Sequence, residues 1–163
     1  MKICFLDNVK ISYTSKDIYT NKIRGAENAI INLSKALSNL SHQVTIYNNC
    51  NNDVKIDNIN WKNINNIQKN MYYDLAISNN DIRLFDKVNA SKKVLISHSI
   101  QSIEKFIRKG QFFAYIKHKS KIALLGEYHK NNRNYLLRMF GSFVIDWAVD
   151  QIFLDSNKAI TKS

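Results

Sequence analysis

The first 47 residues constrain the fold most strongly, because they indicate a strand, a helix and a second strand in succession. Residues 2–7, KICFLD, are mostly apolar and end at a polar residue, which predicts a buried strand. Apolar residues then recur every three or four positions from Ala26 to about residue 39, which predicts a helix, and residues 43–47, QVTIY, predict the next strand. This is a βαβ unit, which implies parallel strands joined by a right-handed crossover.

The remaining sequence continues the alternation of strands and helices. Strands are expected at 74–78 (DLAIS), 93–97 (KVLIS) and 151–155 (QIFLD), with a weaker one at 54–56 before a short helix holding Ile64 and Ile67. Helices are expected after residue 98 and over 129–149, while residues 122–125 fit either a strand or a helix. Runs of apolar residues indicate strands buried on both faces. The sequence therefore predicts an α/β fold, a doubly wound, mainly parallel, Rossmann-like sheet in one domain.

The composition is globular but strongly basic. The 163 residues carry a net charge of +11, which favours anionic partners such as nucleic acid, anionic lipid head groups or phosphorylated small molecules. No run of 18 apolar residues occurs, and the N-terminus is apolar too briefly for a signal peptide, so a cytoplasmic protein is expected. Cys4 and Cys50 are too few for a disulfide framework, and no pair of His or Cys residues has zinc spacing, so no metal site is expected.

Polar residues follow the expected strands, where parallel sheets of this kind bind ligands. They are Asp7, Asn48, Asn79, His98 and Ser156, and the loop around Gly25 is expected at the same edge. An isolated histidine is more often structural than catalytic. The position of His98 at a strand end, beside Ser99 and before a helix, makes a role in the site about equally plausible.

Residues 24–27, RGAE, open the first helix and suit an anion. Gly25 allows unusual backbone angles and leaves room for a ligand, and the N–H groups of the first helical turn attract phosphates. Arg24 adds a guanidinium for bidentate phosphate contact, while Glu27 either caps the helix or accepts a sugar hydroxyl. An ordinary loop with one turn glycine is an equally good interpretation. Neither GxGxxG nor a P-loop is present, so a nicotinamide dehydrogenase and a P-loop nucleotidase are disfavoured.

Several of these segments, in this order, resemble one known family. They are KICFLDN, RGAENAIINLSKALSNLSHQVTIY, YDLAISNN, KVLISHS and DWAVDQIFLDSNKAITKS. Together they are similar to the N-terminal domain of a family 4 (GT-B) glycosyltransferase, with Arg24-Gly25-Ala26-Glu27 standing where that family has Gly-Gly-Ala-Glu. The similarity extends over nearly the whole chain. Arg24 in place of the first glycine departs from the family and implies a less open loop toward the donor diphosphate.

The resemblance implies transfer of a sugar from a nucleotide sugar to an acceptor hydroxyl, without metal or cofactor, in cell-envelope polysaccharide or glycolipid synthesis. It implies that His98 lies near the sugar as a catalytic residue, and that Arg24, Gly25, Glu27 and Ser99 bind the donor diphosphate or sugar. Residues 1–163 would form the acceptor-side domain, with the donor-binding domain absent from this chain. Whether the chain is itself an enzyme stays open, and little activity is expected from it alone.

A second hypothesis is a non-enzymatic basic binding module. Residues 108–121, RKGQFFAYIKHKSK, interleave aromatic residues with five Lys or Arg residues. This pattern could stack nucleic-acid bases, or place a helix against an anionic membrane at the inner face. An ordinary helix with a solvated basic face is the preferred interpretation, and nucleic acid is the weaker partner. A membrane-borne acceptor would reconcile the two hypotheses.

Overall fold

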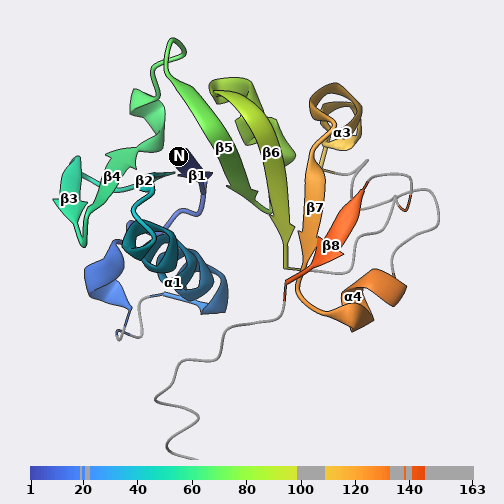
Figure 1. The fold of residues 1–163 in the computed structure, drawn as a ribbon, viewed down its shortest axis with the longest axis horizontal. Helices are drawn as coiled ribbons and strands as arrows, with labels where there is room; N and C mark the ends of the chain where they lie inside the picture. The colour runs from blue at the N-terminus through green and yellow to red at the C-terminus, as the bar shows by residue number, and fades with distance from the viewer. Residues whose placement is uncertain (19, 21–22, 99–108, 133–137, 139–140, 146–163) are drawn as a thin grey trace, which may run out of the picture.

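The computed structural model describes residues 1–18, 20, 23–98, 109–132, 138 and 141–145. These residues form an eight-stranded sheet in the order β3-β4-β2-β1-β5-β6-β7-β8, flanked by helices (Figure 1). All neighbouring strands are parallel except the β3–β4 pair. The strands are β1 (Lys2–Leu6), β2 (Gln43–Asn48), β3 (Val54–Ile56), β4 (Ile59–Asn63), β5 (Tyr72–Asn79), β6 (Asn89–Ser97), β7 (Lys121–Leu124) and β8 (Ser142–Val144). The expected mainly parallel α/β sheet is confirmed.

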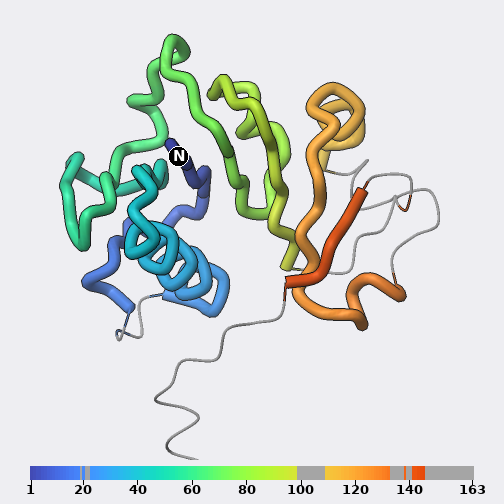
Figure 2. Tube along the Cα trace, viewed as in Figure 1, coloured from blue at the N-terminus to red at the C-terminus, as the bar shows by residue number. Residues whose placement is uncertain are grey.

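The order of the strands reverses once along the chain, as the trace in Figure 2 shows. From β1 the chain builds β2, β3 and β4 on one side. It then crosses to the other side of β1, where β5, β6, β7 and β8 follow one another outward. The reversal lies between β1 and β5. In open parallel sheets, ligands bind outside the carboxyl ends of two such strands.

One face of the sheet is covered by α1 (Gly25–Asn39), which connects β1 to β2 (Figure 1). The side chains of Ile30 and Ile31 on this helix are buried. They belong to a core cluster that includes Ile3, Phe5, Val44, Ile46, Ile59 and Trp61. The βαβ unit predicted from the sequence is confirmed. Its helix begins at Gly25, one residue earlier than expected.

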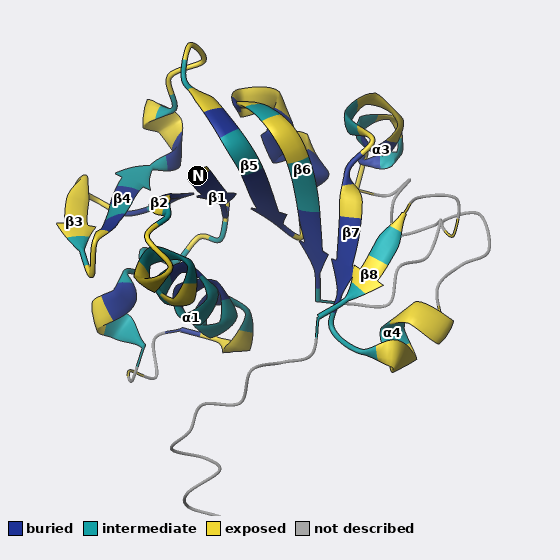
Figure 3. Ribbon diagram, in the orientation of Figure 1, coloured by how far each residue is buried: buried dark blue, intermediate teal, exposed yellow. Residues whose placement is uncertain are grey.

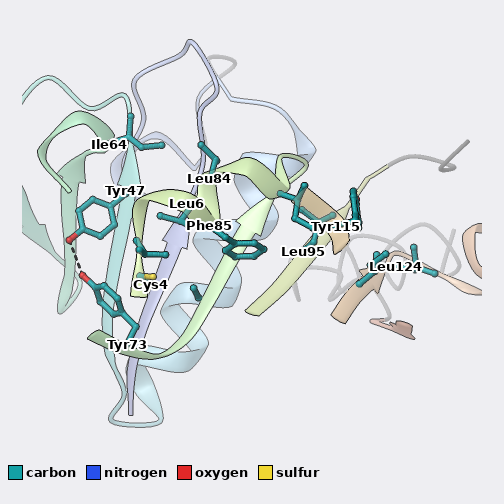
Figure 4. Packing of buried hydrophobic residues seen from close by; sticks show 14 residues of the cluster. Cys4, Leu6, Tyr47, Ile64, Tyr73, Leu84, Phe85, Leu95, Tyr115 and Leu124 are labelled. Carbon is teal, nitrogen blue, oxygen red and sulfur yellow. Dashed lines mark hydrogen bonds between the residues drawn. The ribbon is translucent and has the colours of Figure 1, made fainter. Parts of the chain in front are cut away.

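The opposite face carries the 3-10 helix η3 (Ile82–Lys87) and α3 (Phe112–His118). Phe85 and Tyr115 from these helices belong to the same core cluster as Cys4 and Leu6, which alternate along β1 with the residues under α1 (Figure 4). In the same cluster, the hydroxyl groups of Tyr47 and Tyr73 are hydrogen-bonded at 2.8 Å. Helices therefore cover both faces, as a doubly wound sheet requires.

The region between β2 and β5 differs from its prediction. The weak strand at 54–56 is present as β3, and the short helix is the 3-10 helix η2 (Ile64–Asn66), but β4 between them was not expected. Asp57 and Asn58 both have positive φ, 53° and 60°, and Ile56 pairs with Ile59 across them. Such a two-residue turn closes a hairpin. In the sequence, the Asp-Asn pair between the alternating segments VKI and INW was the signal that could have predicted this hairpin.

The predicted long helix over 129–149 is wrong. The structure has a short helix, α4 (Glu127–Asn131), and then β8, which pairs with β7. Phe143, expected on the buried face of that helix, is 39% exposed in β8. Backbone pairing with the edge of β7 and the β-branched Val144 favour a strand over the weak helical periodicity. Most of the helix predicted after residue 98 falls on residues 99–108, which lie outside the described residues. The strand predicted at 151–155 and Ser156 fall within residues 146–163, which also lie outside them.

Burial is greatest at the centre of the sheet (Figure 3). β1 and β2 are buried along almost their whole length, whereas β3, β8 and α4 are largely exposed at the two ends of the sheet. Residues 122–124, left open between strand and helix by the sequence, are buried in β7. One of these two buried strands, β1, adjoins the reversal of strand order.

Candidate functional site

A cleft of about 460 Å³ opens at the carboxyl ends of β1 and β5, where the strand order reverses. Four segments line it: Asp7, Asn8 and Val9 after β1; Arg24, Ala26 and Glu27 at the start of α1; Asn79, Asn80, Asp81 and Arg83 at the end of β5 and beyond; and Lys109 and Gln111 before α3. The cleft lies where open parallel sheets bind ligands, which makes it the candidate functional site.

Asp7 contributes a buried carboxylate to this cleft. The hydroxyl of Tyr13 donates to its Oδ2 at 2.7 Å, and the backbone N–H of Val9 donates to its Oδ1 at 3.2 Å. Burial raises the pKa of Asp7, and hydrogen bonds from Tyr13 and Asn79 act in the opposite direction. A carboxyl group in this setting can accept a hydrogen bond from a ligand hydroxyl, and it holds a proton more readily than an exposed aspartate does.

Glu27 is buried in the first turn of α1. Its Oε2 accepts a hydrogen bond from the backbone N–H of Arg24 at 2.9 Å. This bond satisfies one of the free N–H groups at the helix start, so the capping role considered for Glu27 is observed. A ligand hydroxyl would have to use the other carboxylate oxygen, Oε1. Arg24 is exposed and lines the cleft.

Gly25 does not use the unusual backbone angles that glycine allows. It is the first residue of α1 and does not have a positive φ, unlike Gly110 and Gly126. A Cβ placed on Gly25 would meet no atom within 4 Å. The backbone would therefore accept another residue here. What glycine provides is open space at a helix start, where unpaired N–H groups face outward.

His98 directly follows β6 and lies beside the cleft. Its backbone N–H donates to Oδ1 of the cleft residue Asn80 at 3.0 Å, and the N–H of Asn80 donates to the carbonyl of Ile96 at 2.9 Å. Burial lowers the pKa of His98, while the charge of Glu27 raises it. The backbone hydrogen bond to Asn80 places His98 next to the lining of the cleft. Ser99 lies outside the described residues.

The lining contains residues that the sequence did not single out. Asp81 caps η3 by accepting the backbone N–H of Arg83 at 3.0 Å, and it also binds the Arg83 guanidinium at 2.9 and 2.6 Å. This contact raises the pKa of Arg83. The polar run from Asn79 to Asp81 after a clear strand was a usable signal. No comparable signal marks Lys109 or Gln111, which reach the cleft because α3 packs against η3.

Charges of both signs line the cleft: three basic residues, Arg24, Arg83 and Lys109, and three acidic ones, Asp7, Glu27 and Asp81. Arg83 is paired with Asp81. With the residues that the structure describes, neither Arg24 nor Lys109 makes an ion pair. Carboxylates and amides suit a ligand rich in hydroxyl groups, and the two cations suit a phosphate. The arrangement therefore favours a polar ligand that carries both.

Among the residues that the structure describes, no group of three His, Cys, Asp or Glu side chains is placed to hold a metal ion. Nor does any helix within these ranges have the length and apolar character needed to cross a membrane.

Comparison with known proteins adds one similarity. A scan against models of protein families gave no match, and neither did a comparison with curated proteins. Among solved structures, sucrose-phosphate synthase from Thermosynechococcus elongatus is similar, with a TM-score of 0.57 and 11% sequence identity. The match covers 99% of this chain and 53% of the synthase chain, so this chain spans about half the length of that protein. At this identity the similarity establishes that the two share a fold.

Proposed function

We propose that this chain is the N-terminal, acceptor-side domain of a GT-B glycosyltransferase. It would take part in transferring a sugar from a nucleotide sugar to an acceptor hydroxyl. The cleft is the observation that supports this proposal most strongly. In it, the buried Asp7 and Glu27 lie together with the exposed Arg24 at the reversal of strand order. Support comes from the fold shared with half of sucrose-phosphate synthase, which is itself a GT-B glycosyltransferase. The resemblance to family 4 supports the same assignment.

Each residue of the proposed site has a separate task. Arg24 and the N–H groups beside Gly25 would bind an anionic group such as the leaving diphosphate, because both favour negative charge. Asp7 and Oε1 of Glu27 would accept hydrogen bonds from sugar hydroxyls. His98 would hydrogen-bond the reacting sugar or the acceptor, with Ser99 beside it in sequence. The resemblance implies that this transfer uses neither a metal nor a cofactor.

The proposal includes a second domain that binds the donor, as the resemblance implies for residues 1–163. Most contacts to the nucleotide would come from that domain. We therefore expect the chain alone to release little or no nucleoside diphosphate from a nucleotide sugar, measured in a coupled assay. Robust turnover by the purified chain would show that the second domain is not needed. The proposed setting is cell-envelope polysaccharide or glycolipid synthesis in the cytoplasm, with peripheral contact at the inner face of the membrane.

Calorimetric titration of the chain tests the ligand class. The ligands are neutral oligosaccharides, sugar phosphates, nucleoside diphosphate sugars and a single-stranded oligonucleotide. Glu27→Gln should weaken binding of a sugar ligand roughly tenfold, since it replaces a charged hydrogen-bond acceptor. Asp53→Asn is the matched control, an exposed acidic residue outside the cleft, and should change binding less than about twofold. The melting temperature of each variant separates loss of the ligand from loss of the fold.

The competing hypothesis of a basic binding module makes the opposite prediction. Binding would then be strongest for the oligonucleotide, would fall steeply with salt, and would not respond to Glu27→Gln. That result, together with no detectable binding of any sugar ligand, would contradict the transferase assignment.

A further inference from the structure

The helix α3 exposes an apolar pair at the surface. Phe113 is 81% exposed and Ile116, one turn later on the helix, is 50% exposed. Tyr115, by contrast, is buried in the core and anchors the helix to the sheet. The rings of Phe112 and Phe113 contact each other edge to face at 5.8 Å. Tyr115 therefore anchors α3 in the core, while Phe113 and Ile116 are exposed at the surface.

Lysines flank this pair. Residues 109–121 contain Lys109, Lys117, Lys119 and Lys121, all exposed, and no acidic residue. Lys117 is paired with Asp86 of η3, whereas the other three make no ion pair with any residue that the structure describes. We name the set Phe113, Ile116, Lys119 and Lys121 the α3 patch. Arg108 of the same basic segment lies outside the described residues.

The α3 patch rests on a fixed support. Asp86 binds both Lys117 and, at 3.2 Å, Nε2 of His118, and Nδ1 of His118 lies 3.2 Å from Nζ of Lys93 on β6. These contacts tie α3 to η3 and to the sheet. Gln111, which immediately precedes the helix, is buried and lines the cleft. The N-terminal end of α3 therefore lies beside the candidate site.

We propose that the α3 patch docks the protein on the anionic leaflet of a membrane. Phe113 and Ile116 would enter the interface between head groups and acyl chains, while Lys119 and Lys121 would contact anionic head groups. The net charge of +11 attracts the whole chain to such a surface. A second copy of the chain fits the patch less well, because lysines would meet lysines. This inference does not depend on the proposed transfer reaction.

Sedimentation of the chain with vesicles tests the proposal without any sugar ligand. The vesicles are phosphatidylcholine alone, or phosphatidylcholine mixed with phosphatidylglycerol. Partitioning should be strong only for the anionic vesicles. Phe113→Ser should lower partitioning to anionic vesicles about tenfold, since the free energy gained by burying a phenylalanine side chain corresponds to a factor of about this size. Tyr128→Ser is the matched control, an aromatic residue 67% exposed on α4, and should leave partitioning unchanged.

A charge series tests the second part of the patch. The double change Lys119→Gln with Lys121→Gln should lower partitioning about thirtyfold, because each lysine near an anionic surface contributes roughly a fivefold factor. Lys55→Gln with Lys69→Gln removes the same charge from exposed positions elsewhere and should have a much smaller effect. All four positions are exposed, so melting curves should remain unchanged.

Four results would overturn the proposal. Equal sedimentation with neutral and anionic vesicles would remove the electrostatic part, and equal losses for the patch and control variants would show that the patch is not the contact. If Phe113→Ser instead converted a dimer to a monomer in sedimentation velocity, with vesicle binding unchanged, the patch would be an interface between copies. Oligonucleotide binding that falls in both patch variants, again with vesicle binding unchanged, would assign the patch to nucleic acid.

Discussion

The two walls of the cleft are built in different ways. The α1 wall, Arg24 to Glu27, begins a helix of 15 residues whose Ile30 and Ile31 are buried in the core. The α3 wall comprises Asp81, Arg83, Lys109 and Gln111 and rests on two short helices, η3 and α3. A cluster of ionisable groups ties these short helices together: Asp86, Lys93, Lys117 and His118.

This difference determines how each wall responds to its conditions. Apolar packing changes little with pH or moderate salt, whereas a cluster of lysine, histidine and aspartate depends on both. Ile82, Leu84 and Phe85 of η3 are buried, but Tyr115 is the one buried residue of α3. A segment with few buried apolar contacts opens locally at lower free energy than a long packed helix. We therefore expect the α1 wall to keep its position and the α3 wall to move or open first.

The largest effect is expected in the packing of α1. Ile31→Ala should lower the free energy of unfolding by about 2–5 kcal/mol, because Ile31 is fully buried and its removal leaves a cavity. Leu40→Ala, at a position 68% exposed just after the same helix, should cost less than about 0.5 kcal/mol. Urea denaturation of the two variants measures both values. Similar losses would show that α1 is not held by its apolar face.

The two partly buried histidines, His98 and His118, distinguish catalysis from support. His98 lies beside the cleft and His118 lies under the α3 wall. In a polypeptide that also contains the donor-binding domain, His98→Ala should lower turnover on the order of a hundredfold, as expected for loss of one transition-state hydrogen bond. His118→Ala should instead lower the melting temperature and leave the turnover of the folded fraction near normal.

Measuring melting temperature and turnover on both variants separates these roles. If His98→Ala melts earlier but keeps normal turnover per folded molecule, His98 is structural and its proposed catalytic role is lost. If His118→Ala reduces turnover without loss of stability, the α3 wall takes part in the chemistry directly.

Acidification should weaken the α3 wall selectively. Burial, and then the charge of Lys93, hold the pKa of His118 below its ordinary value of 6.5. As pH falls below 6.5 the unfolded chain takes up this proton first, so the stability present above 6.5 is lost between 6.5 and the lower folded pKa. Hydrogen-exchange protection of α3 amides should therefore fall between pH 7.5 and 5.5 more than that of α1 amides. His118→Gln should abolish the difference, and if the difference persists another group is responsible.

The smallest effect is expected for Arg83. It is exposed and paired with Asp81, and exposed pairs contribute about 0.2–1 kcal/mol to stability. Arg83→Ala should therefore change the free energy of unfolding by no more than this, and less in high salt. Arg24→Ala, on the other wall, should have no larger effect on stability. A loss of several kcal/mol for Arg83→Ala, measured by denaturation, would show that the pair itself holds the α3 wall.

The sequence predicted the fold well where apolar runs are long. The strand, helix and strand of residues 2–48 were recognisable because burial on both faces leaves an apolar signature. β4 was missed because Asn60, Lys62 and Asn63 dilute its apolar residues, although Ile59 and Trp61 are fully buried. The prediction of a helix over 129–149 was wrong because pairing with β7 decides the structure near Phe143. A paired strand of three residues is too short to show a periodic pattern in the sequence.

The candidate site was only partly predictable. Asp7, Asn79 and His98 could be placed at one edge because they follow parallel strands. Arg83 and Lys109 could not, since their positions depend on how η3 and α3 pack against the sheet. Gly25 does not use the backbone angles that only glycine allows, because a residue at a helix start does not need them.

A map of amide chemical shifts tests the central claim most directly, that both walls form one site for a hydroxyl-rich ligand with an anionic group. The ¹⁵N-labelled chain is titrated with a sugar phosphate. We predict shifts at Glu27, Asn80 and Arg83, on both sides of the cleft, which saturate together with one dissociation constant. Shifts confined to residues 109–121 that vanish with salt, or no shifts at the cleft at all, would contradict it.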